Sequence, residues 1–138
     1  MSKVAVVLLV SLALAWTAAG KDEPLTEAAY ATSAKAWHRD WHATNMTPIH
    51  NHERCVASWQ HADAIRERMV AVEPPASRAD YHAALMAFVE AYLETMDTCV
   101  GNLHITPEWR GQLRVVSDRR RTLIKLVASE KLDLPARW

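Results

Sequence analysis

The stretch Ser77–Gly101, SRADYHAALMAFVEAYLETMDTCVG, decides the fold of this 138-residue chain. Its large side chains recur every three to four residues, which is the spacing of one face of an α-helix. The apolar stripe consists of Tyr81, Leu85, Phe88, Tyr92, Met96 and Cys99. Small and acidic residues occupy the opposite side. We therefore predict a helix over residues 78–100 with one face packed inside the protein.

The segments on either side continue the helical pattern. Pro74-Pro75 separates the stretch from an earlier periodic segment, and Gly101-Asn102 ends it. Three further helices are expected, over residues 26–45, 48–73 and 107–131. Thr26 is a candidate N-cap for the first, and the pairs Thr47-Pro48 and Thr106-Pro107 place a capping threonine before a proline that suits the first helical turn. Short connections between four helices predict an all-α, up-down-up-down antiparallel bundle in one domain, residues 21–138, with a short C-terminal tail.

The two cysteines test this topology. When the chain folds back at residues 74–77, Cys55 and Cys99 come to nearly the same height, because each residue adds 1.5 Å to a helix. Both also lie on the apolar stripes of their helices. We therefore predict a Cys55–Cys99 disulfide between the second and third helices. A metal-ligating thiolate pair or two free thiols are the alternatives, and the absence of a Cys-x-x-Cys motif argues against a redox-active pair.

The first 20 residues have the layout of a secretory signal peptide. Lys3 precedes an apolar run, Val4–Trp16, which the small residues Ala18, Ala19 and Gly20 follow. The run is shorter than the roughly 20 residues that a membrane-spanning helix requires. We therefore expect cleavage after Ala19 or Gly20, a periplasmic or secreted protein, and no membrane span after cleavage.

Composition and motifs exclude several functions. The formal net charge is zero, which argues against nucleic acid as the main partner. Asp40 lies between two histidines, but no hydroxyl or free thiol is obviously paired with them, so no enzyme is predicted. Haem is not favoured, because the Cys-x-x-Cys-His attachment motif is missing and residues 107–131 contain no histidine. Non-covalent haem ligation by Met46 or a first-helix histidine together with His52 or His104 remains open.

The most unusual stretch lies between Trp37 and Trp59, where histidines flank the predicted turn at Thr47-Pro48. His38 and His42 are four residues apart on one helix, so their rings share a face and could chelate one ion. His52 is in line with Cys55 and is expected to point inward. The turn and the loop 101–106 fall at the same end of the bundle, so the predicted metal ligands are His38, His42, Met46, His52, Met96 and His104.

Histidine with thioether ligands favours copper, with zinc or nickel as alternatives, and suits metal buffering, transfer or sensing. The competing interpretation is that these histidines are solvated and that the tryptophans and methionines only fill the core. A second functional class is a cofactor-free binding protein of the cell envelope, of the inhibitor, immunity or adaptor type. Its candidate contact surface is the run Arg119–Arg121 with the tail Leu134–Trp138, because arginine and aromatic residues are common anchors of protein interfaces.

Overall fold

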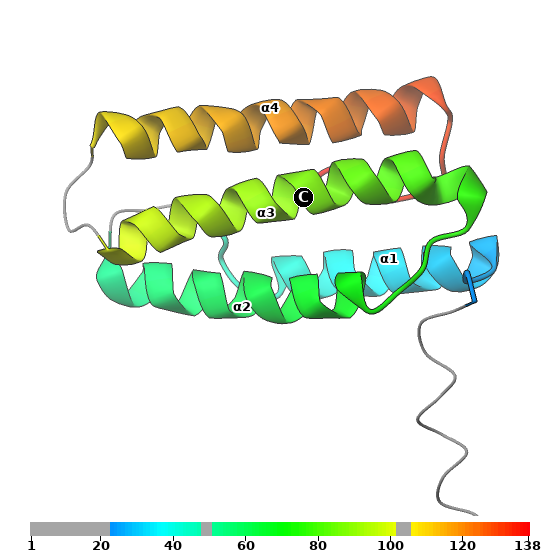
Figure 1. The fold of residues 1–138 in the computed structure, drawn as a ribbon, viewed down its shortest axis with the longest axis horizontal. Coiled ribbons are helices and arrows are strands. Elements are labelled where there is room, and N and C mark those ends of the chain that lie inside the picture. The colour runs from blue at the N-terminus through cyan, green and yellow to red at the C-terminus, as the bar shows by residue number, and fades with distance from the viewer. Residues whose placement is uncertain (1–22, 48–50, 102–105) are drawn as a thin grey trace, which may run out of the picture.

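The computed structural model describes residues 23–47, 51–101 and 106–138. In these ranges the chain forms four α-helices and one short 3-10 helix: α1 Glu27–His42, α2 His52–Val70, η1 Ala76–Arg78, α3 Ala79–Gly101 and α4 Pro107–Ser129. The helices follow one another in antiparallel order, and α3 packs on both α2 and α4 (Figure 1). The predicted four-helix bundle is therefore confirmed, whereas the predicted signal peptide falls outside the described residues.

The starts of the helices follow from their capping residues. Thr26 accepts a hydrogen bond from the backbone N–H of Ala29, and Thr106 accepts one from Trp109, each at 3.1 Å. The predicted start at Thr47-Pro48 is wrong, because α2 begins at His52. Its N-cap is Asn51, whose side chain accepts the N–H of Arg54 at 3.1 Å, and Asn is a stronger N-cap than Thr.

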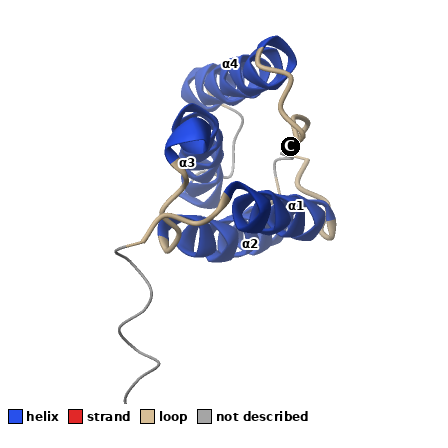
Figure 2. Ribbon diagram, turned by 90° about the vertical axis from the view of Figure 1, so that its right-hand side faces the viewer, coloured by secondary structure: helices blue, strands red, loops and turns tan. Residues whose placement is uncertain are grey.

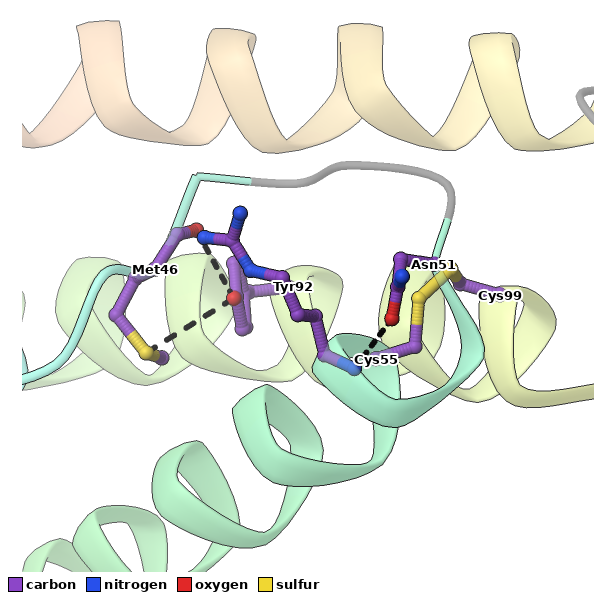
Figure 3. The surroundings of a disulfide bond; sticks show 6 residues. Met46, Asn51, Cys55, Tyr92 and Cys99 are labelled. Atoms are coloured by element: carbon purple, nitrogen blue, oxygen red, sulfur yellow. Dashed lines mark hydrogen bonds between the residues drawn. A yellow bond between two sulfur atoms is a disulfide. The ribbon is translucent and has the colours of Figure 1, made fainter.

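The predicted disulfide is present between α2 and α3. Cys55 and Cys99 are bonded, and their Cα atoms lie 5.9 Å apart. Trp109, in the first turn of α4, packs against the pair to form a small apolar cluster. Figure 3 shows the bond beside Asn51, with Met46 next to Tyr92 on the same side of α3. One end of the bundle is thus tied together by a covalent bond and an aromatic side chain.

The contact between α1 and α4 is made through the tail, residues 130–138. After α4, Lys131 takes a left-handed conformation with φ of 51°, and the N–H of Leu132 bonds back to Val127 at 3.0 Å. This reverses the chain, which then runs between α4 and α1 (Figures 1 and 2). Leu134 and Trp138 are only 8% and 4% exposed and belong to the main core. The prediction of an exposed tail that offers Trp138 to a partner is therefore wrong.

Candidate functional site

The His38–His42 pair lies on α1 and faces the tail. The two ring centroids are 4.5 Å apart, as expected for histidines four residues apart on a helix. Both Nε2 atoms are hydrogen-bonded to the backbone carbonyl oxygen of Arg137, His38 at 2.8 Å and His42 at 3.0 Å. His38 is half-buried and also contacts the Trp138 ring, whereas His42 is exposed. The two imidazoles therefore converge on a single oxygen atom at the protein surface.

Several contacts fix the position of this carbonyl. Pro135 offers its own carbonyl oxygen to two donors, the hydroxyl of Tyr81 at 2.7 Å and the indole N–H of Trp138 at 3.2 Å. The Trp138 ring packs against Trp41 with their centroids 6.1 Å apart. Lys35 pairs with Asp133 at 3.2 Å, although both side chains are largely exposed and the pair contributes little to stability. The tail is thus held on α1 and α3 mainly by buried aromatic groups.

The bonds to Arg137 determine the state of the two rings. A carbonyl oxygen can only accept, so each Nε2 must carry a hydrogen and donate it. In neutral imidazoles, both Nδ1 atoms then keep free lone pairs. A metal ion at Nε2 would have to displace the Arg137 carbonyl and move the ring proton. The two imidazoles are therefore already aligned toward one point, and the carbonyl oxygen of Arg137 occupies that point.

Neither His52 nor Met96 is gathered with this pair. His52 is the first residue of α2 and is exposed, so its predicted inward orientation is wrong. Met96 is 1% exposed and packs within the main core. His104 lies outside the described residues. Within the ranges described, no three or more His, Cys, Asp or Glu side chains form a group suited to a metal ion.

Met46 follows α1 and lies near His42. It is half-buried, and it lines one pocket together with His42. The hydroxyl of Tyr92 donates to the Met46 carbonyl oxygen at 3.0 Å and lies 3.9 Å from the Met46 sulfur, as Figure 3 shows. The thioether sulfur therefore lies against Tyr92 of α3.

The His38–His42 pair does not lie at the end of the bundle that carries the disulfide, for a geometric reason. Helix α1 ends at His42, three residues earlier than predicted, and α2 begins only at His52. His42 therefore lies near Arg120 in the middle of α4, rather than beside the disulfide. The end of the bundle is instead occupied by Cys55, Cys99 and Trp109.

Asp40 has a structural role between α1 and α2. Its carboxylate accepts from Arg68 at 2.6 Å and from Arg39 at 3.1 Å, and these two hydrogen bonds lower the pKa of Asp40 below its ordinary value. The carbonyl oxygen of Asp40 also accepts from His61 at 2.7 Å. These contacts tie α1 to α2. The Asp40 carboxylate is bonded to the two arginines and not to His38 or His42.

His82 also proves to be half-buried, although its place in the sequence suggests a solvated side chain. Its Nδ1 bonds the hydroxyl of Tyr30 at 3.0 Å, and its ring contacts Trp37. Burial lowers the pKa of His82 below 6.5, although the nearby carboxylate of Glu73 opposes this shift. A charged His82 is therefore disfavoured in the folded protein.

This burial predicts a pH dependence of stability. Well above pH 6.5 the ring is neutral in both states and contributes no slope. Between 6.5 and the lower folded pKa, the unfolded chain binds more protons, so the free energy of unfolding falls as the pH falls. Replacing His82 with Phe should reduce this fall, which urea denaturation from pH 7.5 to 5 would measure. If the free energy of unfolding falls equally in the wild-type protein and in His82→Phe, the assignment to His82 is wrong. The control is His52→Phe, at an exposed site, which should leave this pH dependence unchanged.

A pocket of about 360 Å³ opens beside the histidine pair. Trp41 and Trp138, which are only 2% and 4% exposed, contribute to its lining together with polar residues. The described residues that line it are Trp41, His42, Thr44, Asn45, Met46, Thr47, Arg120 and Trp138. The sequence gives no sign of this pocket, because the pocket depends on the tail lying between α1 and α4.

Comparisons of the chain with protein-family models, with curated proteins and with solved structures find no match. In the described part of the chain, none of the helices combines the length and the apolar character that crossing a bilayer requires.

Proposed function

We propose that this protein binds a transition metal ion at the His38–His42 pair, with copper preferred over zinc or nickel, for buffering, transfer or sensing. One observation carries the proposal: both Nε2 atoms converge on one oxygen, at 2.8 and 3.0 Å. Two imidazoles on one helix face form a chelating pair, and imidazole is a common ligand of copper, zinc and nickel. The role is binding rather than catalysis.

Met46 supports the preference for copper. Thioether sulfur is a soft ligand that selects Cu(I) over Zn(II) and Ni(II). Met46 lines the same pocket as His42, which makes its thioether the candidate third ligand of this proposal. Cu(I) is stable with only two or three ligands, so two histidines and one methionine are sufficient for it. His52, Met96 and His104 are not part of the proposed site.

Export from the cytoplasm belongs to the same proposal. The Cys55–Cys99 bond is typical of proteins that fold in an oxidising compartment. The pattern of residues 1–20 is that of a secretory signal peptide, which would direct the protein to the periplasm or out of the cell. An exported copper-binding protein would meet its ion outside the reducing cytoplasm.

The test is a metal titration of untagged protein expressed with its own leader. Native mass spectrometry and competition with a chromogenic Cu(I) chelator should show one bound ion. His38→Ala and His42→Ala should each weaken binding by more than about tenfold, which corresponds to about 1.4 kcal/mol. Met46→Leu should weaken Cu(I) binding but leave Zn(II) binding unchanged, because only the soft thioether is removed.

His52→Ala is the matched control for this titration, because His52 is an exposed histidine away from the pair. It should bind metal like the wild-type protein. The proposal is wrong if no stoichiometric ion is bound, or if His52→Ala weakens binding as much as His38→Ala does.

A further inference from the structure

The carbonyl oxygen of Arg137 occupies the position that a metal ion would take between His38 and His42. Both Nε2–H groups point at this oxygen, over distances of 2.8 and 3.0 Å. A metal ion bound to an imidazole nitrogen lies about 2 Å away, in the direction that the N–H group takes. The ion and the oxygen would then be about 1 Å apart or less, which is too short for any contact. The carbonyl must therefore leave its present position when an ion binds at Nε2.

The chemistry of the ion determines where the carbonyl goes. A backbone carbonyl is a hard ligand that suits magnesium, calcium or manganese, whereas Cu(I) prefers soft ligands. The Arg137 oxygen is therefore a poor ligand for Cu(I), and we expect it to move away from the ion instead of binding it. Arg137 is exposed at the protein surface, so water can replace the hydrogen bonds that its carbonyl loses. The displacement thus leaves no buried carbonyl without a partner.

The carbonyl belongs to a segment that is anchored on both sides. The next residue, Trp138, is only 4% exposed, and its ring lies 5.2 Å from that of His38. Two residues before Arg137, the carbonyl oxygen of Pro135 accepts a hydrogen bond from the hydroxyl of Tyr81 at 2.7 Å. A shift of the Arg137 backbone therefore disturbs both the packing of Trp138 and the bond from Tyr81.

The tail, residues 130–138, can detach without unfolding any helix. It forms neither helix nor strand, and the chain reverses at Lys131, whose φ is 51°. The helices remain joined by the packing of α3 on α2 and α4, and by the disulfide. Detachment would expose Leu134 and Trp138, which are 8% and 4% exposed when the tail is docked. The apolar surface between α1 and α4 would be uncovered at the same time.

We propose that Cu(I) binding at the His38–His42 pair releases the tail from the core. This inference rests on the proposed metal site, and it selects sensing among the three roles given there. In the metal-free protein the tail is docked and Trp138 is buried, whereas in the metal-bound protein both Trp138 and Leu134 are exposed. Because the ion and the Arg137 carbonyl compete for one position, a change that loosens the tail must strengthen metal binding.

The first test measures Cu(I) affinity in variants that loosen the tail but keep both histidines. Tyr81→Phe removes only the hydroxyl that bonds Pro135. One hydrogen bond corresponds to about fivefold in an equilibrium constant. Tyr81→Phe should therefore bind Cu(I) about fivefold more tightly than the wild-type protein, as measured by competition with a chromogenic chelator. Trp138→Ala should gain more than about tenfold, because a buried aromatic ring contributes more than one hydrogen bond.

Tyr30→Phe is the matched control for this comparison. It also removes a hydroxyl from a buried tyrosine, but that hydroxyl bonds His82 and not the tail. Its affinity for Cu(I) should equal that of the wild-type protein. The far-ultraviolet circular dichroism of each variant verifies that the bundle is folded. If Trp138→Ala does not fold, the comparison of Tyr81→Phe with Tyr30→Phe decides the outcome.

The second test follows the tail directly. Hydrogen exchange of the Trp138 indole N–H, which bonds Pro135 in the docked tail, is measured by NMR without and with Cu(I) under anaerobic conditions. The signal is identified by its loss in Trp138→Phe. Saturation with Cu(I) should speed the exchange by more than about tenfold, because the indole then reaches solvent.

Three results would overturn the inference. If Tyr81→Phe and the wild-type protein bind Cu(I) equally and the exchange of the indole N–H is unchanged, the ion binds without moving the tail. If Tyr81→Phe binds Cu(I) more weakly and the exchange slows, the ion fastens the tail through the Arg137 carbonyl. Both of these results leave the metal site itself intact. If neither protein binds an ion, the metal site and the release of the tail are both wrong.

Discussion

Replacing Cys55 and Cys99 together with alanine is expected to lower the free energy of unfolding by at least about 4 kcal/mol. The bond joins residues 44 positions apart, and a cross-link of that span removes about 4 kcal/mol of chain entropy from the unfolded state. The lost sulfur atoms also leave a gap beside Trp109, since both cysteines are almost fully buried. Urea denaturation of the variant and the wild-type protein would measure the difference.

Reduction of the wild-type protein separates the contribution of the cross-link from that of the buried sulfur atoms. The reduced chain keeps the volume of both sulfur atoms and loses only the cross-link. It should therefore fall between the oxidised protein and the double variant in stability. Equal denaturation midpoints for the oxidised and the reduced protein would show that the bond does not stabilise the fold.

Replacing Trp138 with alanine should cost about 3–5 kcal/mol, the usual range for a buried tryptophan. The ring is 4% exposed and contacts Trp41 and His38. Its removal opens the space between α1 and α4, and the hydrogen bond from its indole N–H to Pro135 is lost. Because single domains are commonly stable by only about 5–15 kcal/mol, the variant should melt at a clearly lower temperature.

Arg137→Ala is the matched control for this prediction. Its side chain is exposed, and the carbonyl that bonds both histidines belongs to the backbone and is retained. The change should stay within about 0.5 kcal/mol of the wild-type stability. If both variants melt at the same temperature as the wild-type protein, the tail does not contribute to the core.

The helices and the disulfide could be predicted because local rules determine them. Prolines and capping threonines mark the beginnings of α1 and α4, and the stripe from Tyr81 to Cys99 marks the buried face of α3. The start of α2 could not be predicted in the same way, because two capping residues compete there. Thr47 donates its backbone N–H to the Asn45 side chain at 3.0 Å, and Asn51 caps the helix.

The candidate site was predictable only in part. The spacing of His38 and His42 is sufficient to pair their rings, because both lie on one helix. Their partner comes from Arg137, whose carbonyl position depends on the path of the tail after Lys131. No periodic pattern marks Leu134 and Trp138 as core residues, since they belong to no helix. The pocket with Arg120 depends on the same non-helical packing.

The tail also affects how the chain reaches its folded state. Most packing in this bundle joins consecutive helices, and such short-range contacts form quickly. The contacts of Lys35 with Asp133 and of His38 with Arg137 instead join residues 98 and 99 positions apart. Closing so long a loop costs entropy before any contact compensates for it. The contact order is therefore higher than in a bundle closed by consecutive helices alone, and the tail should dock late, onto helices that have already assembled.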